Sequence, residues 1–152
     1  MYLVSACLAG EKCRMDGKDK LVPAIGRLVE EGRAISVCPE VLGGLPTPRS
    51  PSERRGDRVV NAAGEDVTEQ FLRGAEESLR ICREHGCEGA ILKSKSPSCG
   101  CGVIHNGAFD GGLTAGNGVL TQLLLDAGIP VMTEQEFAAR EERIASMRRG
   151  GA

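Results

Sequence analysis

The sequence predicts an α/β domain, a small three-layer fold with a mostly parallel sheet of the flavodoxin or Rossmann type. Short apolar runs alternate with helix-like segments along the chain, which is the pattern of βαβ units. The chain has 152 residues, 41% hydrophobic and 26% charged, as is typical of a globular protein that buries its own core. We therefore expect a single domain over residues 1–147, followed by a short tail, 148–152.

The first half of the chain supplies two strands and one helix. We expect a strand at Tyr2–Ser5, a helix at Pro23–Glu31 and a second strand at Ile35–Val37. Proline suits the first turn of a helix, and an apolar stripe of Ile25, Leu28 and Val29 follows it. The proline-punctuated stretch 43–64 is predicted to be loop, with a short strand at Arg58–Asn61.

The second half repeats the alternation. A helix should begin at Asp66 or Thr68 and end near His85, because apolar residues recur at helical spacing. A strand at Ala90–Leu92 leads to glycine-rich turns between residues 100 and 118. The chain is then expected to form a helix over 119–127, a short strand over 129–132 and a closing helix over 134–147.

Composition excludes some classes of function. Aromatic residues make up 3% of the chain and the net charge is −2, which argues against a nucleic-acid-binding surface. No apolar run is long enough to span a bilayer, and the first residues do not resemble a secretory signal. We therefore expect a cytoplasmic protein with no membrane association. The seven cysteines then favour metal binding or catalysis over disulfides.

Three cysteines follow predicted strands. Cys7 and Cys38 come directly after strands, and Cys99 comes a few residues after a third. Because strand ends at one edge of a parallel sheet converge, the three thiols are expected to meet. The sequence predicts a metal centre with three thiolate ligands and an open coordination position.

The flanking residues add candidate chemistry. Glu40 lies two residues after Cys38, where a carboxylate could move a proton, although a capping role is an equal alternative. The loop Ser96–Gly102 offers backbone N–H groups and hydroxyls to a cluster or a reacting water, with Lys93 and Lys95 adding positive charge nearby. Its alternative reading is a turn of small residues.

Other interpretations of the cysteines remain open. Any single buried cysteine can be a small hydrophobic residue, and Cys82 falls on the apolar stripe of a helix. The cysteines could instead hold structural zinc, although no C-x2-C pair occurs. A third possibility is a thiol redox protein that uses Cys99 and Cys101. His85 and His105 have no partner at a recognisable spacing and are expected to be structural or exposed.

Taken together, the motifs resemble the thiouracil desulfidase family of small iron-sulfur proteins, once known only as an uncharacterised domain family. The resemblance extends over nearly the whole chain to about Glu134. The matching segments are Ser5-Ala6-Cys7-Leu8, Cys13-Arg14 with Asp16-Gly17, Cys38 to Arg49, Asp66-Val67-Thr68 with Phe71, Ile91-Leu92-Lys93 and Ser96-Pro97-Ser98-Cys99-Gly100.

The resemblance implies a 4Fe-4S cluster held by Cys7, Cys38 and Cys99, with one iron open to the sulfur of a small thiolated substrate such as 2-thiouracil. Water would replace that sulfur without net redox change, and Glu40 and Ser96 would position or activate it. Met15 stands where the family pattern has tyrosine. The motif leaves open whether Cys13 is a ligand, and the sequence does not specify the oligomeric state or the substrate.

Overall fold

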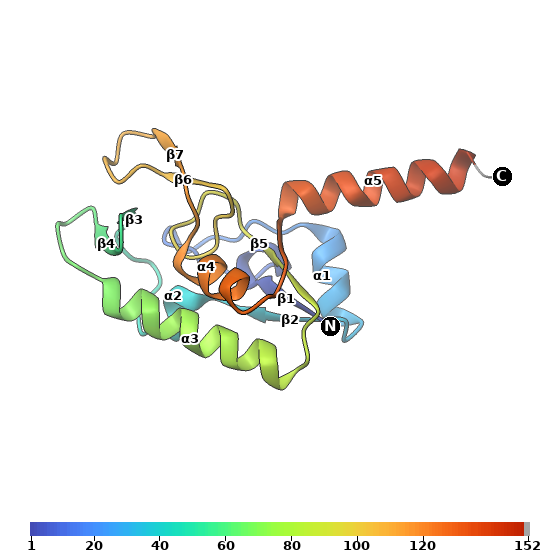
Figure 1. Cartoon of the computed structure of the whole chain (residues 1–152), viewed down its shortest axis with the longest axis horizontal. Coiled ribbons are helices and arrows are strands. Elements are labelled where there is room, and N and C mark those ends of the chain that lie inside the picture. The colour runs from blue at the N-terminus through green and yellow to red at the C-terminus, as the bar shows by residue number, and fades with distance from the viewer. Residues whose placement is uncertain (151–152) are drawn as a thin grey trace.

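A four-stranded parallel sheet forms the centre of the domain (Figure 1) in a computed structural model that describes residues 1–150. Its strands are β1 (Tyr2–Ser5), β2 (Ala34–Val37), β5 (Gly89–Leu92) and β8 (Val131–Thr133). They lie in the order β2-β1-β5-β8, and every neighbouring pair is parallel. The predicted α/β fold class is confirmed.

The strand order creates a switch point in the middle of the sheet. The chain passes from β1 outward to β2, and then crosses to β5 on the other side of β1. In sheets of this kind the connections leave β1 and β5 in opposite directions, so a crevice opens at their carboxyl ends. A ligand site is therefore expected beyond Ser5 and Leu92.

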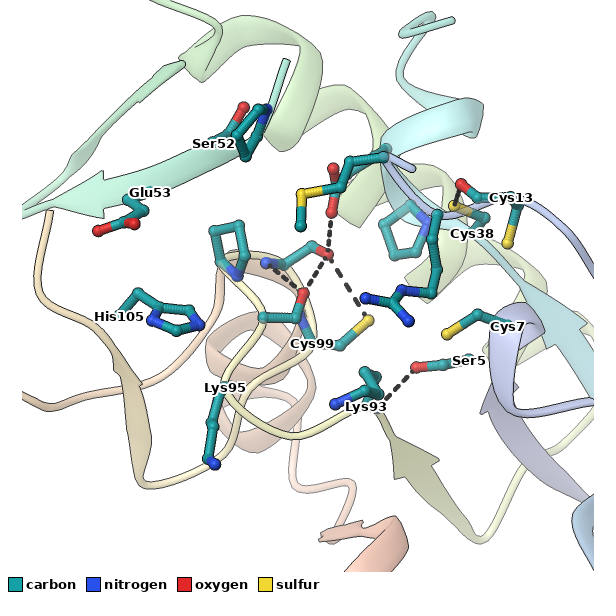
Figure 2. A pocket seen from close by; sticks show the side chains of 18 of the residues that line it. Ser5, Cys7, Cys13, Cys38, Ser52, Glu53, Lys93, Lys95, Cys99 and His105 are labelled. Carbon is teal, nitrogen blue, oxygen red and sulfur yellow. Dashed lines mark hydrogen bonds between the residues drawn. The ribbon is translucent and has the colours of Figure 1, made fainter. Parts of the chain in front are cut away.

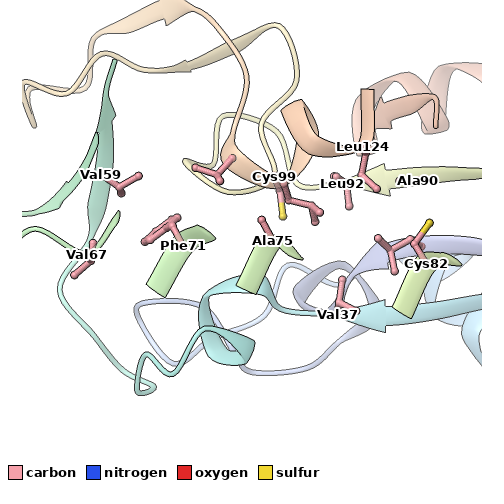
Figure 3. Close-up of a cluster of buried hydrophobic side chains, with 13 residues drawn as sticks. Val37, Val59, Val67, Phe71, Ala75, Cys82, Ala90, Leu92, Cys99 and Leu124 are labelled. Atoms are coloured by element: carbon pink, nitrogen blue, oxygen red, sulfur yellow. The ribbon is translucent and has the colours of Figure 1, made fainter. Parts of the chain in front are cut away.

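Helices cover both faces of the sheet, because alternate strand residues point to opposite sides. Leu3 and Leu92 pack with α3 (Thr68–Glu84) and α4 (Val119–Asp126) in one buried cluster, which Figure 3 shows around Phe71. Val4 and Ile91 pack with α1 (Pro23–Glu30) and with Phe137 of α5 (Glu134–Gly150) in the other. The domain thus has the three expected layers.

Short elements outside the sheet build the loops at its carboxyl edge. They are the 3-10 helix η1 (Ala6–Ala9), the helix α2 (Pro39–Leu42), and the antiparallel hairpins β3 (Ser52–Arg55)–β4 (Arg58–Asn61) and β6 (Val103–His105)–β7 (Leu113–Ala115). The expected strand at Arg58–Asn61 is confirmed. The loop prediction for 43–64 is otherwise wrong at β3, whose Ser-Glu-Arg-Arg sequence has no apolar residue to signal a strand.

The closing helix α5 (Glu134–Gly150) is longer than predicted and extends away from the rest of the domain (Figure 1). Residues 148–150 of the expected tail form its last turn, and 151–152 lie outside the described residues. Within α5 only Phe137 is buried. Over residues 1–150, no helix is both long and apolar enough to cross a membrane.

Candidate metal centre and active site

The three cysteines predicted from the strand ends lie around one cavity of about 420 Å³ (Figure 2). Cys7 sits in η1 directly after β1, and Cys38 caps α2 directly after β2. Cys99 lies in the loop that follows β5. The cavity therefore opens at the switch point of the sheet, where three chain segments distant in sequence meet.

The protein environment strongly affects the protonation of these thiols. Burial, with a smaller contribution from nearby Cys38, raises the pKa of Cys7 to about 11. Burial likewise raises the pKa of Cys99 to about 12. A hydrogen bond from the Cys13 side chain lowers the pKa of Cys38 to about 7. Three adjacent thiolates would repel one another, so binding a cationic centre here must displace protons from Cys7 and Cys99.

Cys13 adds a fourth thiol to the cavity lining. Its backbone carbonyl accepts a hydrogen bond from the Cys38 thiol at 3.8 Å, and its own pKa is raised by hydrogen bonding to Cys38 and by burial. Cys13 is therefore a direct neighbour of Cys38. Cys101 lies outside the cavity lining, whereas Cys82 packs in the hydrophobic core as predicted.

The spacing of the donors bears on which metal group they can hold. Among residues 1–150, no three histidine, cysteine or acidic side chains lie close enough to share a single metal ion. Two sulfurs on one zinc lie within about 4.6 Å of each other, because each Zn–S bond is about 2.3 Å long. In a 4Fe-4S cluster each cysteine binds a different iron. The free thiols around one cavity, buried at Cys7 and Cys99 and half-buried at Cys38, are thus chemically suited to a cluster.

Glu40 lies in the cavity wall on the first turn of α2, and both of its carboxylate oxygens accept hydrogen bonds. Arg49 Nε donates to Oε1 at 3.0 Å, and Ser98 Oγ donates to Oε2 at 3.1 Å. The side chains of Arg49 and Glu40 are only 6% and 15% exposed. The carboxylate is therefore fixed in place beside the candidate ligands.

Ser96 connects to Glu40 through Ser98. Ser96 Oγ accepts the backbone N–H groups of Ser98 and Cys99, both at 3.1 Å. Its remaining hydrogen-bond partner is Ser98 Oγ at 3.0 Å, so the Ser96 hydroxyl is placed to donate to Ser98. Ser98 in turn donates to Glu40. The result is an ordered chain of hydroxyls that ends on the carboxylate.

Ser98 and Arg49 are site residues not singled out from the sequence, although Ser98 lies in the loop whose hydroxyls are expected to serve the site. Ser98 is 2% exposed, and its hydroxyl also lies 3.6 Å from the sulfur of Cys99. Both residues occur inside the motifs that point to the family, which is the signal that could have found them. Their contacts with Glu40 depend on the packing of separate loops, which sequence spacing does not reveal.

Positive charge also lines the cavity. Lys93 Nζ lies 3.5 Å from a carboxylate oxygen of Glu134, and that carboxylate accepts hydrogen bonds from the N–H and hydroxyl of Ser94. Lys93 opposes the rise in the pKa of Cys7. Met15, which is 40% exposed, and half-buried His105 lie in the lining as well. The cavity thus combines soft sulfur donors with both signs of charge.

Comparison with known proteins agrees with this reading of the site. The chain is 46% identical to a solved "[4Fe-4S]-dependent thiouracil desulfidase TudS", with a TM-score of 0.87, over 95% of this chain and 97% of that one. It is 43% identical over 147 residues to the uncharacterized protein YbbK of Bacillus subtilis (strain 168), which covers 90% of this chain and 97% of YbbK. The model of the 2-thiouracil desulfurase family matches residues 2–136, so the chain belongs to that family.

Proposed function

We propose that the protein is a 4Fe-4S cluster-dependent desulfidase that removes sulfur from 2-thiouracil or a similar small thioamide. The observation that carries the proposal is the meeting of Cys7, Cys38 and Cys99 in one cavity with the fixed carboxylate of Glu40. The similarity to a solved [4Fe-4S]-dependent thiouracil desulfidase supports it. The seven free cysteines suit a reducing compartment, and we propose the cytoplasm.

The three cysteines would hold the cluster as thiolates, and Cys13 would lie beside Cys38 with its own thiol available as a hydrogen-bond donor to that thiolate. When bound, the cluster would supply a Lewis-acidic iron for the thiocarbonyl sulfur. The reaction exchanges sulfur for oxygen: a C=O bond from water replaces the C=S bond, the sulfur leaves as hydrosulfide with one proton of the water, and the other proton is released. No electrons are gained or lost overall.

Glu40 is the group placed to take a proton from the attacking water. Arg49 fixes one of its oxygens, and the Ser96–Ser98 pair fixes the other. The hydroxyls orient the carboxylate, and either can hand on a proton through the same chain. A positioned base of this kind contributes about 10²- to 10⁴-fold to the rate of a reaction.

The first test is anaerobic purification with assays of iron, sulfide and zinc, followed by incubation with 2-thiouracil. We expect a brown protein that releases hydrosulfide and forms uracil. Replacing Cys7, Cys38 or Cys99 with serine should abolish both the colour and the activity, whereas Cys82→Ser should retain both. A colourless wild-type protein with stoichiometric zinc would contradict the proposal.

Glu40→Gln separates catalysis from cluster binding. Glutamine keeps a hydrogen-bonding side chain of the same length but cannot accept a proton from water at neutral pH. We expect kcat to fall about 100-fold or more while the visible absorbance of the cluster is retained. Unchanged kcat in the cluster-loaded variant would remove Glu40 from the proposed role.

A further inference from the structure

One wall of the cavity carries chemistry that the proposed sulfur exchange does not use. It consists of Glu53 on β3, His105 at the end of β6 and Phe109 in the β6–β7 loop, which we call the recognition wall. Figure 2 shows Glu53 and His105 on the side of the cavity opposite Cys7, Cys13 and Cys38. A ligand whose sulfur lies near the cysteines would therefore present another edge to this wall.

Glu53 is a buried carboxylate with one engaged oxygen. The residue is 8% exposed, and its Oε1 accepts the backbone N–H groups of Gly107 and Phe109 at 2.9 and 3.2 Å. Within residues 1–150 it forms no ion pair, and no hydrogen bond reaches Oε2. Burying a carboxylate costs free energy unless its oxygens find donors. Oε2 of Glu53 is thus suited to accept a hydrogen bond from a donor group on a bound ligand.

Two further energetic costs are concentrated on the same wall. Phe109 has a φ of 56°, in the left-handed region that non-glycine residues seldom adopt. The Nδ1 atom of His105 is buried without a hydrogen-bond partner among the described residues. Such costs persist where the surrounding structure imposes them, and they gather at functional sites. The only other non-glycine residue described with positive φ, Lys95, also lines this cavity.

The wall also offers an aromatic surface. Phe109 is part of the cavity lining. The guanidinium of Arg55, a residue outside the lining, lies 5.9 Å from the centroid of the Phe109 ring. Arg55 Nε donates to the carbonyl of Gly107 at 2.8 Å, which fixes the loop that carries Phe109. An aromatic side chain held in this way favours a flat ring as its partner.

We infer that the recognition wall selects a planar heterocycle with an unsubstituted ring N–H, which donates to Glu53 Oε2 while the ring packs against Phe109. This inference rests on the proposed function for the identity of the reacting group, and it narrows the substrate class to thiolated heterocycles and related cyclic thioamides that keep a free N–H at the ring position facing Glu53. If the ring nitrogen that faces Glu53 carries a substituent, Oε2 receives no hydrogen bond. Leaving a buried acceptor unpaired costs binding free energy, so such a ring should bind much more weakly.

Glu53→Gln is the informative variant, because glutamine can keep the bonds to Gly107 and Phe109. Its carbonyl oxygen can replace Oε1, while its NH₂ group replaces the Oε2 acceptor with a donor. We expect the Kd for uracil and the KM for 2-thiouracil to rise about 10- to 100-fold in the anaerobic holoenzyme, with cluster absorbance unchanged. Phe109→Leu should also raise the Kd for uracil and the KM for 2-thiouracil, by a smaller factor. Glu76→Gln, on the exposed face of α3, is the matched control and should match wild type.

Methylated ligands test the assigned hydrogen bond directly. Of 1-methyluracil and 3-methyluracil, one should bind wild type much more weakly than uracil, and Glu53→Gln should weaken its binding no further. If neither methyl group reduces affinity, or if Glu53→Gln binds uracil as wild type does, the inference is overturned. If wild type turns over 2-thiouracil and the Glu53 and Phe109 variants show the same Kd and KM as wild type, the inference is overturned and the proposed function stands.

A wild type that does not turn over 2-thiouracil would instead count against the proposed function. Uracil binding then decides the inference separately. Binding that Glu53→Gln weakens would support the recognition wall, and the absence of uracil binding would overturn it too.

Discussion

At the residue scale, Asp66 shows how one side chain joins two elements outside the sheet. Its Oδ1 accepts the backbone N–H of Thr68 at 2.9 Å, at the start of α3. Its Oδ2 accepts two hydrogen bonds from Arg58 on β4, the shorter at 2.6 Å. Hydrogen bonds from Thr68 and then from Arg58 lower the pKa of Asp66 to about 2. The ionised carboxylate is thus favoured in the folded state.

Asp66 should make the free energy of unfolding depend on pH in the acidic range. Because its folded pKa lies below the ordinary value of 3.8, its contribution is present above about pH 4 and is lost as the pH falls toward 2. We expect Asp66→Asn to lower the urea midpoint of the metal-free protein at pH 6 and to lower it less at pH 3. A difference that stays constant across this range would show that the ionised form gives no advantage.

Single residues also show how far sequence reasoning reaches into the site. Cys7 and Cys38 could be placed together because a strand end fixes where the next residue lies, and the fold class then brings the strand ends to one edge. Ser98 and Glu53 could not be placed in this way. Ser98 acts on Glu40 from a loop 58 residues away, and Glu53 lies on a strand with no apolar pattern.

At the element scale, the position of α2 depends on backbone contact with α3. A Cβ atom added at Gly74 would lie 1.7 Å from the carbonyl oxygen of Pro39, and one at Gly43 would lie 1.9 Å from that of Gln70. Both neighbours are backbone atoms, which cannot move aside as a flexible side chain can. These two glycines therefore allow α2, which carries Glu40 and begins at Cys38, to lie directly against α3.

Gly74→Ala should force the two helices apart. We expect a loss of about 2 kcal/mol or more in the free energy of unfolding, because overpacking of a close contact typically costs about 1–3 kcal/mol. Activity should fall even at temperatures where the variant remains folded, since Glu40 moves with α2. Urea denaturation and the activity of the folded fraction measure the two effects. Glu76→Ala, on the exposed face of the same helix, should change neither, and wild-type stability in Gly74→Ala would refute the packing argument.

The helices and strands differ in how accurately they can be predicted from the sequence. The helix α3 matches its prediction because its apolar residues recur at helical spacing over many turns. The strand β8 starts at Val131, later than the expected residue 129. An apolar run in the sequence does not show which of its residues is the first to pair with the neighbouring strand. The order of the strands is a property of how the helices pack across the sheet, so no local pattern encodes it.

At the scale of the whole molecule, α5 divides into two parts. Its first turn contributes Glu134 to the ion pair with Lys93, and Phe137 is buried against the sheet. Beyond Glu142 its side chains are exposed or only partly buried. We expect a chain that ends after Glu142 to keep the thermal midpoint, cluster absorbance and activity of the full protein. Loss of the cluster in this truncated chain would assign the distal half of α5 a structural role.

The three cysteines at the switch point belong to segments that lie about 30 and about 60 residues apart along the chain. A cluster bound to all of them would act as a crosslink that closes two long loops, and such a crosslink lowers the entropy of the unfolded chain. The same three sulfur atoms would then govern both turnover and resistance to unfolding. Oxidative loss of the cluster would inactivate the protein and, at the same time, release the loops above a sheet that keeps its hydrophobic core.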